Sequence, residues 1–448
     1  MTTFARSVDA LERMETRVIN GTVDSVRGLT VYVRRLRVPI GSVVRIDGGS
    51  RQRESLLGEV IGFDRSRAIV MLLGGSSGTA PGDRVHLERV SDSIMVGDSW
   101  LGRVLDGLGR PIDGGPQPSG LESRLLFPPV VNPMSRGMVD QPLATGVRAI
   151  DGMTTLGKGQ RIGIFAGPGV GKSTLMASIA RGTEADVNVI ALVGERGREV
   201  KEFIVDALGD EGLARSVVVV ATGDESPLLR VRAMAAAITA AEYFRDRGRD
   251  VMLMVDSITR FAQAQRQIGL AAGEQPATKG YTPSVFSLLP QLLERAGGLE
   301  GGGSITGIYT VLVEGDDLTE PVADAAKGIL DGHVVLSRRL AGRGHFPAID
   351  PLESVSRLAD QVSDPNHVTA RRRLVELLAA HRESEELINI GAYAQGSNPV
   401  TDVAIGLKPA IDAFLRQDRD ERTDFPLTCR ALCELAAESE RQRQASSS

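Results

Sequence analysis

The chain has 448 residues, which allows about three domains if a domain takes ~150 residues. Hydrophobic residues make up 42% of the sequence, charged residues make up 24%, and the net charge is −5. This balance is typical of an ordinary soluble globular protein. It argues against a protein whose main partner is nucleic acid, because neutralising phosphates needs a basic surface.

The N-terminal segment, residues 1–16, is predicted to form a short amphipathic helix, with Val8, Leu11 and Met14 at helical spacing. It is charged throughout and lacks the apolar core of a signal peptide. No stretch of the chain approaches the ~18 apolar residues that span a bilayer. From residue 17 to residue 92, short β-branched runs alternate with Gly-, Asp- and Ser-rich breaks, which favours a small β-barrel or sandwich. These runs are Leu29–Val33, Val43–Ile46, Glu59–Phe63, Ala68–Leu72 and Arg84–Leu87.

Residues 93–358 show a repeating pattern of strand, loop and helix. Such alternation is typical of an α/β domain in which a parallel sheet is covered by helices on both faces. The predicted strands are Arg161–Ala166, Val187–Val193, Ser216–Thr222 and Val251–Val255. The predicted helices between them are Lys172–Arg181, Glu199–Leu208 and Leu228–Arg245.

Residues 359–448 carry no strand signal, so we expect a helical C-terminal domain. Its predicted helices are His367–Ala380, Glu383–Ile390, Val400–Leu415 and Thr428–Arg441. Cys429 and Cys433 are the only cysteines of the chain and lie four residues apart, which predicts two half-buried thiols on one helix face. Two cysteines cannot build a disulfide framework, so a reducing cytosol is the expected compartment.

A glycine-rich loop follows the predicted strand Arg161–Ala166 and leads directly into a helix. Its sequence from Ala166 is AGPGVGKS, a phosphate-binding loop with alanine in place of the usual first glycine. Glycines let backbone N–H groups converge on phosphate oxygens, and the helix N-terminus adds a partial positive charge. We expect Lys172 to contact the β- and γ-phosphates and Ser173 to bind Mg²⁺. The predicted nucleotide-binding residues of this loop are Gly167, Pro168, Gly169, Val170, Gly171, Lys172, Ser173 and Thr174.

Two acidic residues follow strands of the same predicted sheet. Asp256 ends an apolar strand, where an aspartate caps a helix or holds a metal; the phosphate loop in the same sheet favours a partner for Mg²⁺ and its water shell. Glu195 follows another strand and faces the same edge, because parallel strands share their carboxyl ends. A carboxylate there can polarise an attacking water. From spacing alone, Glu195 can equally be an ordinary helix N-terminal acid. Arg196 and Glu199 follow closely and can help to hold the phosphate and the metal-bound waters.

Longer motifs extend these signals along most of the chain. They include GRVLDGLGRPIDG (Gly102–Gly114), TGVRAIDG (Thr145–Gly152), ALVGERGREV (Ala191–Val200), DSITRFAQAQR (Asp256–Arg266) and PAIDPLESVSR (Pro347–Arg357). Through these motifs the chain resembles the catalytic subunits of rotary ATP synthases, and more closely the ATPases of flagellar and type III secretion export. The resemblance implies a RecA-like phosphate-loop core with a parallel sheet, preceded by a small β-barrel and followed by a helical domain.

The resemblance also implies roles for individual residues. Glu195 matches the family's water-activating carboxylate, and Arg357 matches an arginine finger that reaches into the neighbouring subunit's site. A guanidinium suits this task because it is permanently charged and presents a planar fork. Phe346 occupies the position of a tyrosine that stacks on adenine, and the replacement keeps the stacking face. Asp316 and Asp317 match a loop that touches a central stalk, and residues 1–16 match the contact with a stator-like regulator.

The sequence therefore predicts a Mg²⁺-dependent ATPase that drives flagellar or type III secretion protein export as a homohexamer. The implied partners are its own copies, the regulator, the stalk protein, export chaperones with their cargo, and an export gate, without nucleic acid. The implied location is cytoplasmic, at the inner face of the membrane. Three alternatives stay open: a catalytic subunit of a rotary synthase, a ring subunit that binds nucleotide without turnover, and an RNA translocase of the transcription-termination type.

Overall fold

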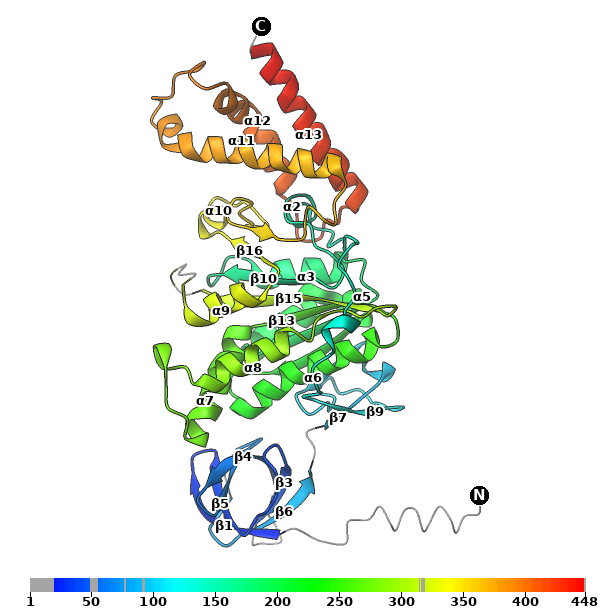
Figure 1. Ribbon diagram of the computed structural model, residues 1–448, viewed down its shortest axis with the longest axis vertical. Coiled ribbons are helices and arrows are strands. Elements are labelled where there is room, and N and C mark those ends of the chain that lie inside the picture. The colour runs from blue at the N-terminus through cyan, green and yellow to red at the C-terminus, as the bar shows by residue number, and fades with distance from the viewer. Residues whose placement is uncertain are drawn as a thin grey trace, which may run out of the picture.

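The computed structural model describes residues 20–48, 55–75, 78–90, 93–313, 315 and 319–446. A β-barrel lies at one end of the molecule, a helical bundle lies at the other, and a large sheet with its covering helices lies between them (Figure 1). The expected fold class is therefore confirmed. The predicted helix within residues 1–16 and the acidic pair Asp316 and Asp317 lie outside the described residues.

The barrel is closed and has six strands in the order β1-β2-β5-β4-β3-β6, with β1 pairing back to β6. Val31, Val33 and Val70 fill its interior with less than 1% exposure. The sequence runs predicted five of the strands. β1 escaped prediction because its sequence, NGTVDSVR, alternates weakly and buries few apolar side chains. The strands are β1 (Asn20–Arg27), β2 (Thr30–Arg34), β3 (Val43–Asp47), β4 (Leu56–Asp64), β5 (Arg67–Leu72) and β6 (Arg84–Arg89).

The central sheet has the strand order β17-β16-β10-β15-β13-β11-β12-β8, with β14 paired to β15. Every pairing in it is parallel except those of β14 and β17. Its strands are β8 (Arg103–Asp106), β10 (Arg161–Ala166), β11 (Val187–Val193), β12 (Ser216–Ala221), β13 (Asp250–Asp256), β14 (Gly297–Gly298), β15 (Ser304–Leu312), β16 (Gly332–Leu336) and β17 (Val355–Ser356). A separate two-stranded sheet pairs β7 (Ser93–Val96) with β9 (Glu122–Leu125).

Helices cover both faces of the central sheet, as the alternating pattern predicts. One face packs against α6 (Pro227–Arg245), α7 (Ile258–Ala272), α8 (Pro283–Leu293) and α9 (Pro321–Ile329). The other face packs against α3 (Lys172–Gly182), α2 (Arg148–Met153) and a chain of short helical segments. That chain replaces the single helix predicted at Glu199–Leu208: α4 (Gly197–Glu202) and α5 (Gly209–Ala214) flank a π-helical segment, Phe203–Leu208. Single 3₁₀ turns lie at Asp98–Trp100, Pro133–Ser135 and Thr278–Gly280.

The C-terminal bundle consists of α11 (Pro365–Asn389), α12 (Pro399–Leu415) and α13 (Phe425–Ser446), and α10 (Arg338–Gly342) lies nearby (Figure 1). The prediction of two helices within α11 was wrong. His381 and Arg382 at the expected break tolerate helical geometry, and Arg382 is anchored to Asp350 by two 2.7 Å hydrogen bonds. Cys429 and Cys433 are free and half-buried on α13, as expected. Within the described ranges, no helix combines the length and the apolar character that crossing a bilayer requires.

Candidate active site

The glycine-rich loop connects the buried strand β10 to α3. Gly169 and Gly171 have φ angles of 77° and 92°, in the left-handed region that side chains disfavour, so glycine is needed at both positions. Gly171 immediately precedes α3, and the first turn of that helix leaves backbone N–H groups without partners inside the helix. Ser173 and Thr174 are exposed in this turn. The loop and helix start together form an anion-binding surface.

Lys172, Asp256 and Glu195 converge at the carboxyl edge of the sheet. The Lys172 ammonium donates a hydrogen bond to Asp256 Oδ1 and lies 3.6 Å from Glu195 Oε1. Thr310 is on β15, which lies between β10 and β13, and donates a 2.7 Å hydrogen bond to the same Asp256 oxygen. Thr310 could not be predicted as part of the site, because a threonine inside an apolar strand carries no signal of its own.

Glu195 has an electrostatic environment unlike that of a surface carboxylate. Burial raises its pKa above the usual glutamate value, and the negative charge of Asp256 raises it further, while Lys172 opposes both effects. Its Oε1 atom is buried and has no hydrogen-bond partner among the described residues. A buried carboxylate oxygen without a donor is suited to accept a proton from a water molecule.

Arg196 and Glu199 lie at the margin of this cluster. The Arg196 guanidinium is 86% exposed and pairs with Glu199 Oε1 at 3.2 Å. Neither side chain has a recorded hydrogen bond or ion pair with Lys172. The structure thus brings Lys172, Asp256 and Glu195 together and leaves Arg196 and Glu199 at the solvent side of the same edge.

The oxygen donors at this edge fit a magnesium ion that is shared with a phosphate ligand. Ser173 offers a hydroxyl at the start of α3, and Asp256 and Glu195 offer carboxylates within a few ångströms of Lys172. Among the described residues, no cluster of three or more His, Cys, Asp or Glu side chains forms a metal cage. Magnesium commonly takes one or two carboxylates and completes its shell with water and substrate phosphates, which matches this donor set.

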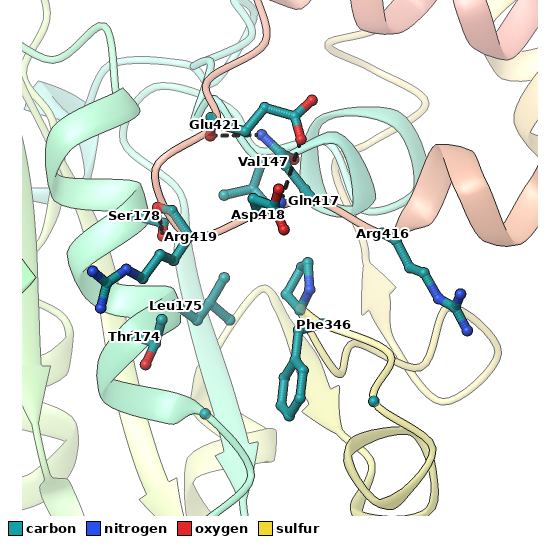
Figure 2. Close-up of a pocket in the computed structure, with 13 residues that line it drawn as sticks. Val147, Thr174, Leu175, Ser178, Phe346, Arg416, Gln417, Asp418, Arg419 and Glu421 are labelled. Atoms are coloured by element: carbon teal, nitrogen blue, oxygen red, sulfur yellow. Dashed lines mark hydrogen bonds between the residues drawn. The ribbon is translucent and has the colours of Figure 1, made fainter.

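A cavity of about 420 Å³ opens beside the phosphate loop (Figure 2). The Phe346 ring lies across it from Thr174 and Leu175 of α3 and packs next to Gly171. The far wall is the linker between α12 and α13, residues 416–424, which the sequence analysis did not connect with the site. Its cavity-lining residues are Arg416, Gln417, Asp418, Arg419 and Glu421. The size of the cavity and its aromatic wall suit a planar base attached to phosphates held by the loop.

Arg357 lies near the amino ends of the parallel strands, whereas the phosphate loop lies at their carboxyl ends. It directly follows the edge strand β17, which runs antiparallel to β16. Its backbone N–H donates to the carbonyl of Asp331, whose own N–H donates to the carbonyl of Arg161 at the start of β10. The Arg357 side chain is exposed, and its guanidinium contacts the carbonyl of Lys327 at 3.3 Å.

The length of β10 separates Arg357 from Lys172, because Arg357 lies near the first residue of this strand and Lys172 follows its last. Arg161 and Ala166 are the first and last residues of β10. At ~3.3 Å per residue, the two ends of this strand lie roughly 16 Å apart. One arginine side chain cannot cross that distance, so the structure does not bring Arg357 to the phosphate loop of its own chain.

Comparisons with known proteins agree with this architecture. Residues 146–356 match the model of the ATP synthase alpha/beta family, nucleotide-binding domain, and residues 363–434 match that of the T3SS EscN ATPase C-terminal domain. The flagellum-specific ATP synthase of Bacillus subtilis is 48% identical over 435 residues, covering 97% of this chain and 99% of the relative. The type 3 secretion system ATPase of Sinorhizobium fredii is 46% identical over 417 residues, covering 93% and 92%.

Solved structures give the same result. The assembled ATPase EscN from the enteropathogenic E. coli type III secretion system matches with a TM-score of 0.87 and 42% identity, covering 93% of this chain and 100% of that chain. EscN in complex with its central stalk EscO matches with a TM-score of 0.86 at the same identity and coverage. The site geometry, both family models and these near-full-length matches lead to one conclusion: the chain belongs to the family of flagellum-specific and type III secretion ATPases, within the wider ATP synthase alpha/beta family.

Proposed function

We propose that this chain hydrolyses ATP with Mg²⁺ and thereby energises protein export through a flagellar or type III secretion apparatus. It works as a homohexameric ring whose active sites are shared between adjacent subunits. The observation that carries this proposal is the position of Glu195, which is half-buried beside Lys172 and Asp256; its buried Oε1 atom lies 3.6 Å from the Lys172 ammonium and makes no hydrogen bond within the described residues. A subunit that only bound nucleotide would have no need of a buried carboxylate there.

The residues have distinct roles in the proposed reaction. Lys172 and the loop N–H groups bind the β- and γ-phosphates, and Glu195 accepts a proton from the attacking water. Ser173 and Asp256 hold the metal ion, partly through water, with Glu199 reaching its water shell. When bound, Mg²⁺ supplies positive charge that offsets the charge on the transferred phosphoryl group. Phe346 stacks on the adenine, and Arg196 lies at the solvent side of the phosphate site.

Arg357 completes the site of the neighbouring subunit. The roughly 16 Å between the two ends of β10 rules out a contact with the phosphate loop of the same chain. In a ring of identical subunits joined head to tail, one surface of each subunit contacts a different surface of the next. The exposed guanidinium then stabilises negative charge on the γ-phosphoryl group across the interface.

Partners and location follow from the same proposal. A stator-like regulator binds residues 1–16, a central stalk protein contacts the loop with Asp316 and Asp317, and export chaperones deliver cargo to the ring. The ring lies in the cytoplasm, at the inner membrane beneath an export gate. The relative EscN has been solved in complex with its central stalk EscO, which supports the stalk contact.

A phosphate-release assay tests the hydrolysis. The purified full-length chain should release phosphate from ATP with Mg²⁺, and a chelator should abolish the release. Glu195→Gln should remove the activity. The matched control is Glu438→Gln on α13 of the C-terminal bundle, whose partly exposed side chain pairs with Arg441 at 2.6 Å. Wild-type protein with no activity at any assembly state would refute the proposal in favour of a non-hydrolysing ring subunit.

The nearest alternative is a catalytic subunit of a rotary synthase. The match of residues 363–434 to the EscN C-terminal domain favours the export ATPase. Purification from the native host discriminates the two, because a synthase subunit would copurify with a second, non-catalytic nucleotide-binding subunit. An RNA translocase is disfavoured by the net charge of −5, and salt-dependent RNA binding would revive it.

A further inference from the structure

Arg148, within the motif TGVRAIDG, holds the linker between α12 and α13. Its side chain is 16% exposed and lies on the short helix α2, away from the phosphate loop. Within the described part of the chain, all the acceptors of the guanidinium lie at the end of α12 or in the linker. The acceptors are Phe414 O at 2.8 Å, Thr423 Oγ1 at 3.1 Å, Arg416 O and a carboxylate oxygen of Glu421.

Gln417 connects the same linker to the segment Gly146–Arg148 and to Phe346. Its side-chain oxygen accepts the Arg148 backbone N–H at 2.8 Å, and its amide donates to Gly146 O at 2.7 Å. Its backbone N–H donates to the carbonyl of Phe346 at 2.9 Å. The linker and the aromatic wall of the cavity are therefore joined directly.

The helix α3 also holds the linker, through Ser178 and Arg181. Ser178 Oγ donates to the carbonyl of Arg419 at 2.9 Å, and the Arg181 guanidinium donates to the same carbonyl and pairs with Asp420 at 3.2 Å. Figure 2 shows Ser178 and Arg419 together at the left, above Leu175 and Thr174, with Phe346 below the linker. Hydrogen bonds from α2 and from α3, and one to the carbonyl of Phe346, thus set the position of this linker.

We infer that Arg148 is a positioning residue for nucleotide binding, which fixes the base-side wall of the cavity without touching the nucleotide. The inference rests on the proposed function, because it takes the cavity as the site of the ATP base. The phosphate side depends on Lys172 and the loop, which Arg148 does not contact. Loss of Arg148 therefore weakens the hold on the base and ribose and leaves the hold on the phosphates intact. This role would also explain why the TGVRAIDG motif matters for nucleotide binding although Arg148 does not contact the nucleotide.

The experiment compares Arg148→Met and Arg148→Lys with a matched control, Arg136→Met. Arg136 is half-buried and also donates to two backbone carbonyls, those of Ala296 and Glu294, at 3.0 and 2.5 Å. Those carbonyls follow α8 and lie outside the cavity. Loss of charge-assisted hydrogen bonds at Arg148 should raise KM for ATP roughly 10-fold, with kcat within about 3-fold of wild type. Arg148→Lys should lie between, because lysine keeps the charge but loses the fork.

Inorganic tripolyphosphate separates positioning from general damage, since it has phosphates but no base. Its inhibition constant should be the same for wild type, both Arg148 variants and Arg136→Met. An equal loss for ATP and tripolyphosphate, or an unchanged KM for ATP in folded Arg148→Met, would overturn the inference. If Arg148→Met does not fold, Arg148→Lys decides by the same two outcomes.

Failure of the proposed function would be visible separately. Wild-type protein would then release no phosphate. In that case, dissociation constants for ATP and tripolyphosphate, measured by equilibrium dialysis, take the place of KM and the inhibition constant. Weaker ATP binding with unchanged tripolyphosphate binding in the Arg148 variants supports the inference in that case as well. Wild-type protein that binds tripolyphosphate but shows no added affinity for ATP would overturn it.

Discussion

Mixed rings of two inactive variants test whether the active site is shared. Glu195→Ala removes the carboxylate beside Lys172, and Arg357→Ala removes the exposed guanidinium at the opposite edge of the sheet. Each variant alone should lose roughly 10³-fold or more in kcat, the range for removing an arginine finger or a water-orienting group. Neither change removes a buried apolar side chain, so both variants should assemble.

The recovery on mixing follows from the geometry of the interface. A site is intact when its loop side comes from an Arg357→Ala subunit and its finger side from a Glu195→Ala subunit. In rings assembled at random from equal amounts, each of these choices has a chance of one half. Roughly one quarter of the interfaces are then complete, and about a quarter of wild-type phosphate release should return if the sites act independently.

The assay is phosphate release from variants that are mixed, dissociated and reassembled, with mixed composition checked by native mass spectrometry using a tagged copy. The matched control mixes Glu195→Ala with the double variant Glu195→Ala, Arg357→Ala, which can form no complete site. Verified mixed rings without recovery would refute the trans assignment. Recovery in the control mixture would show that the activity comes from elsewhere.

Three further outcomes are expected. Phe346→Ala should raise KM for ATP roughly 10-fold, because stacking on a base contributes about 1–3 kcal/mol, while Phe346→Tyr should keep the wild-type value in the same steady-state assay. Since burial raises the pKa of Glu195 and its charged form is the active base, kcat/KM should fall on acidification with a midpoint above the usual glutamate pKa; a flat profile down to pH 4.5 would contradict this. Arg295→Met should lower the free energy of unfolding in urea by ~3–5 kcal/mol, because it leaves the buried Glu242, now held at 2.6 and 2.9 Å, without its partner. Arg198→Met removes an exposed pair and is the control, expected to leave the urea midpoint unchanged.

The phosphate side of the site could be predicted from the sequence because its signals are local. The loop lies between a strand and a helix, Asp256 ends an apolar strand, and Glu195 follows another by two residues. Parallel topology then places all three at one edge without further information. The close contact between Lys172 and Asp256 is the physical outcome of that rule.

The base side could not be predicted in this way. Its wall comes from residues 416–424, more than 240 positions after the phosphate loop, and is held by Arg148 and Gln417. No periodicity or spacing connects a linker in a helical bundle with a cavity beside a sheet. The strand β1 was missed for a different reason: closure of the barrel, rather than its own weak alternation, makes it a strand.

The separation of Lys172 and Arg357 along the strands of the central sheet has a consequence for how the protein responds to dilution. Lys172 follows the carboxyl end of β10 and Arg357 lies near its amino end, so with the proposed trans role of Arg357 a single folded chain does not complete a site. On this proposal, a dispersed chain is expected to bind ATP without consuming it, and turnover per chain should rise as chains become concentrated. The same proposal implies that little ATP is used before rings assemble. Assembly of the ring would then be one means of controlling ATP turnover.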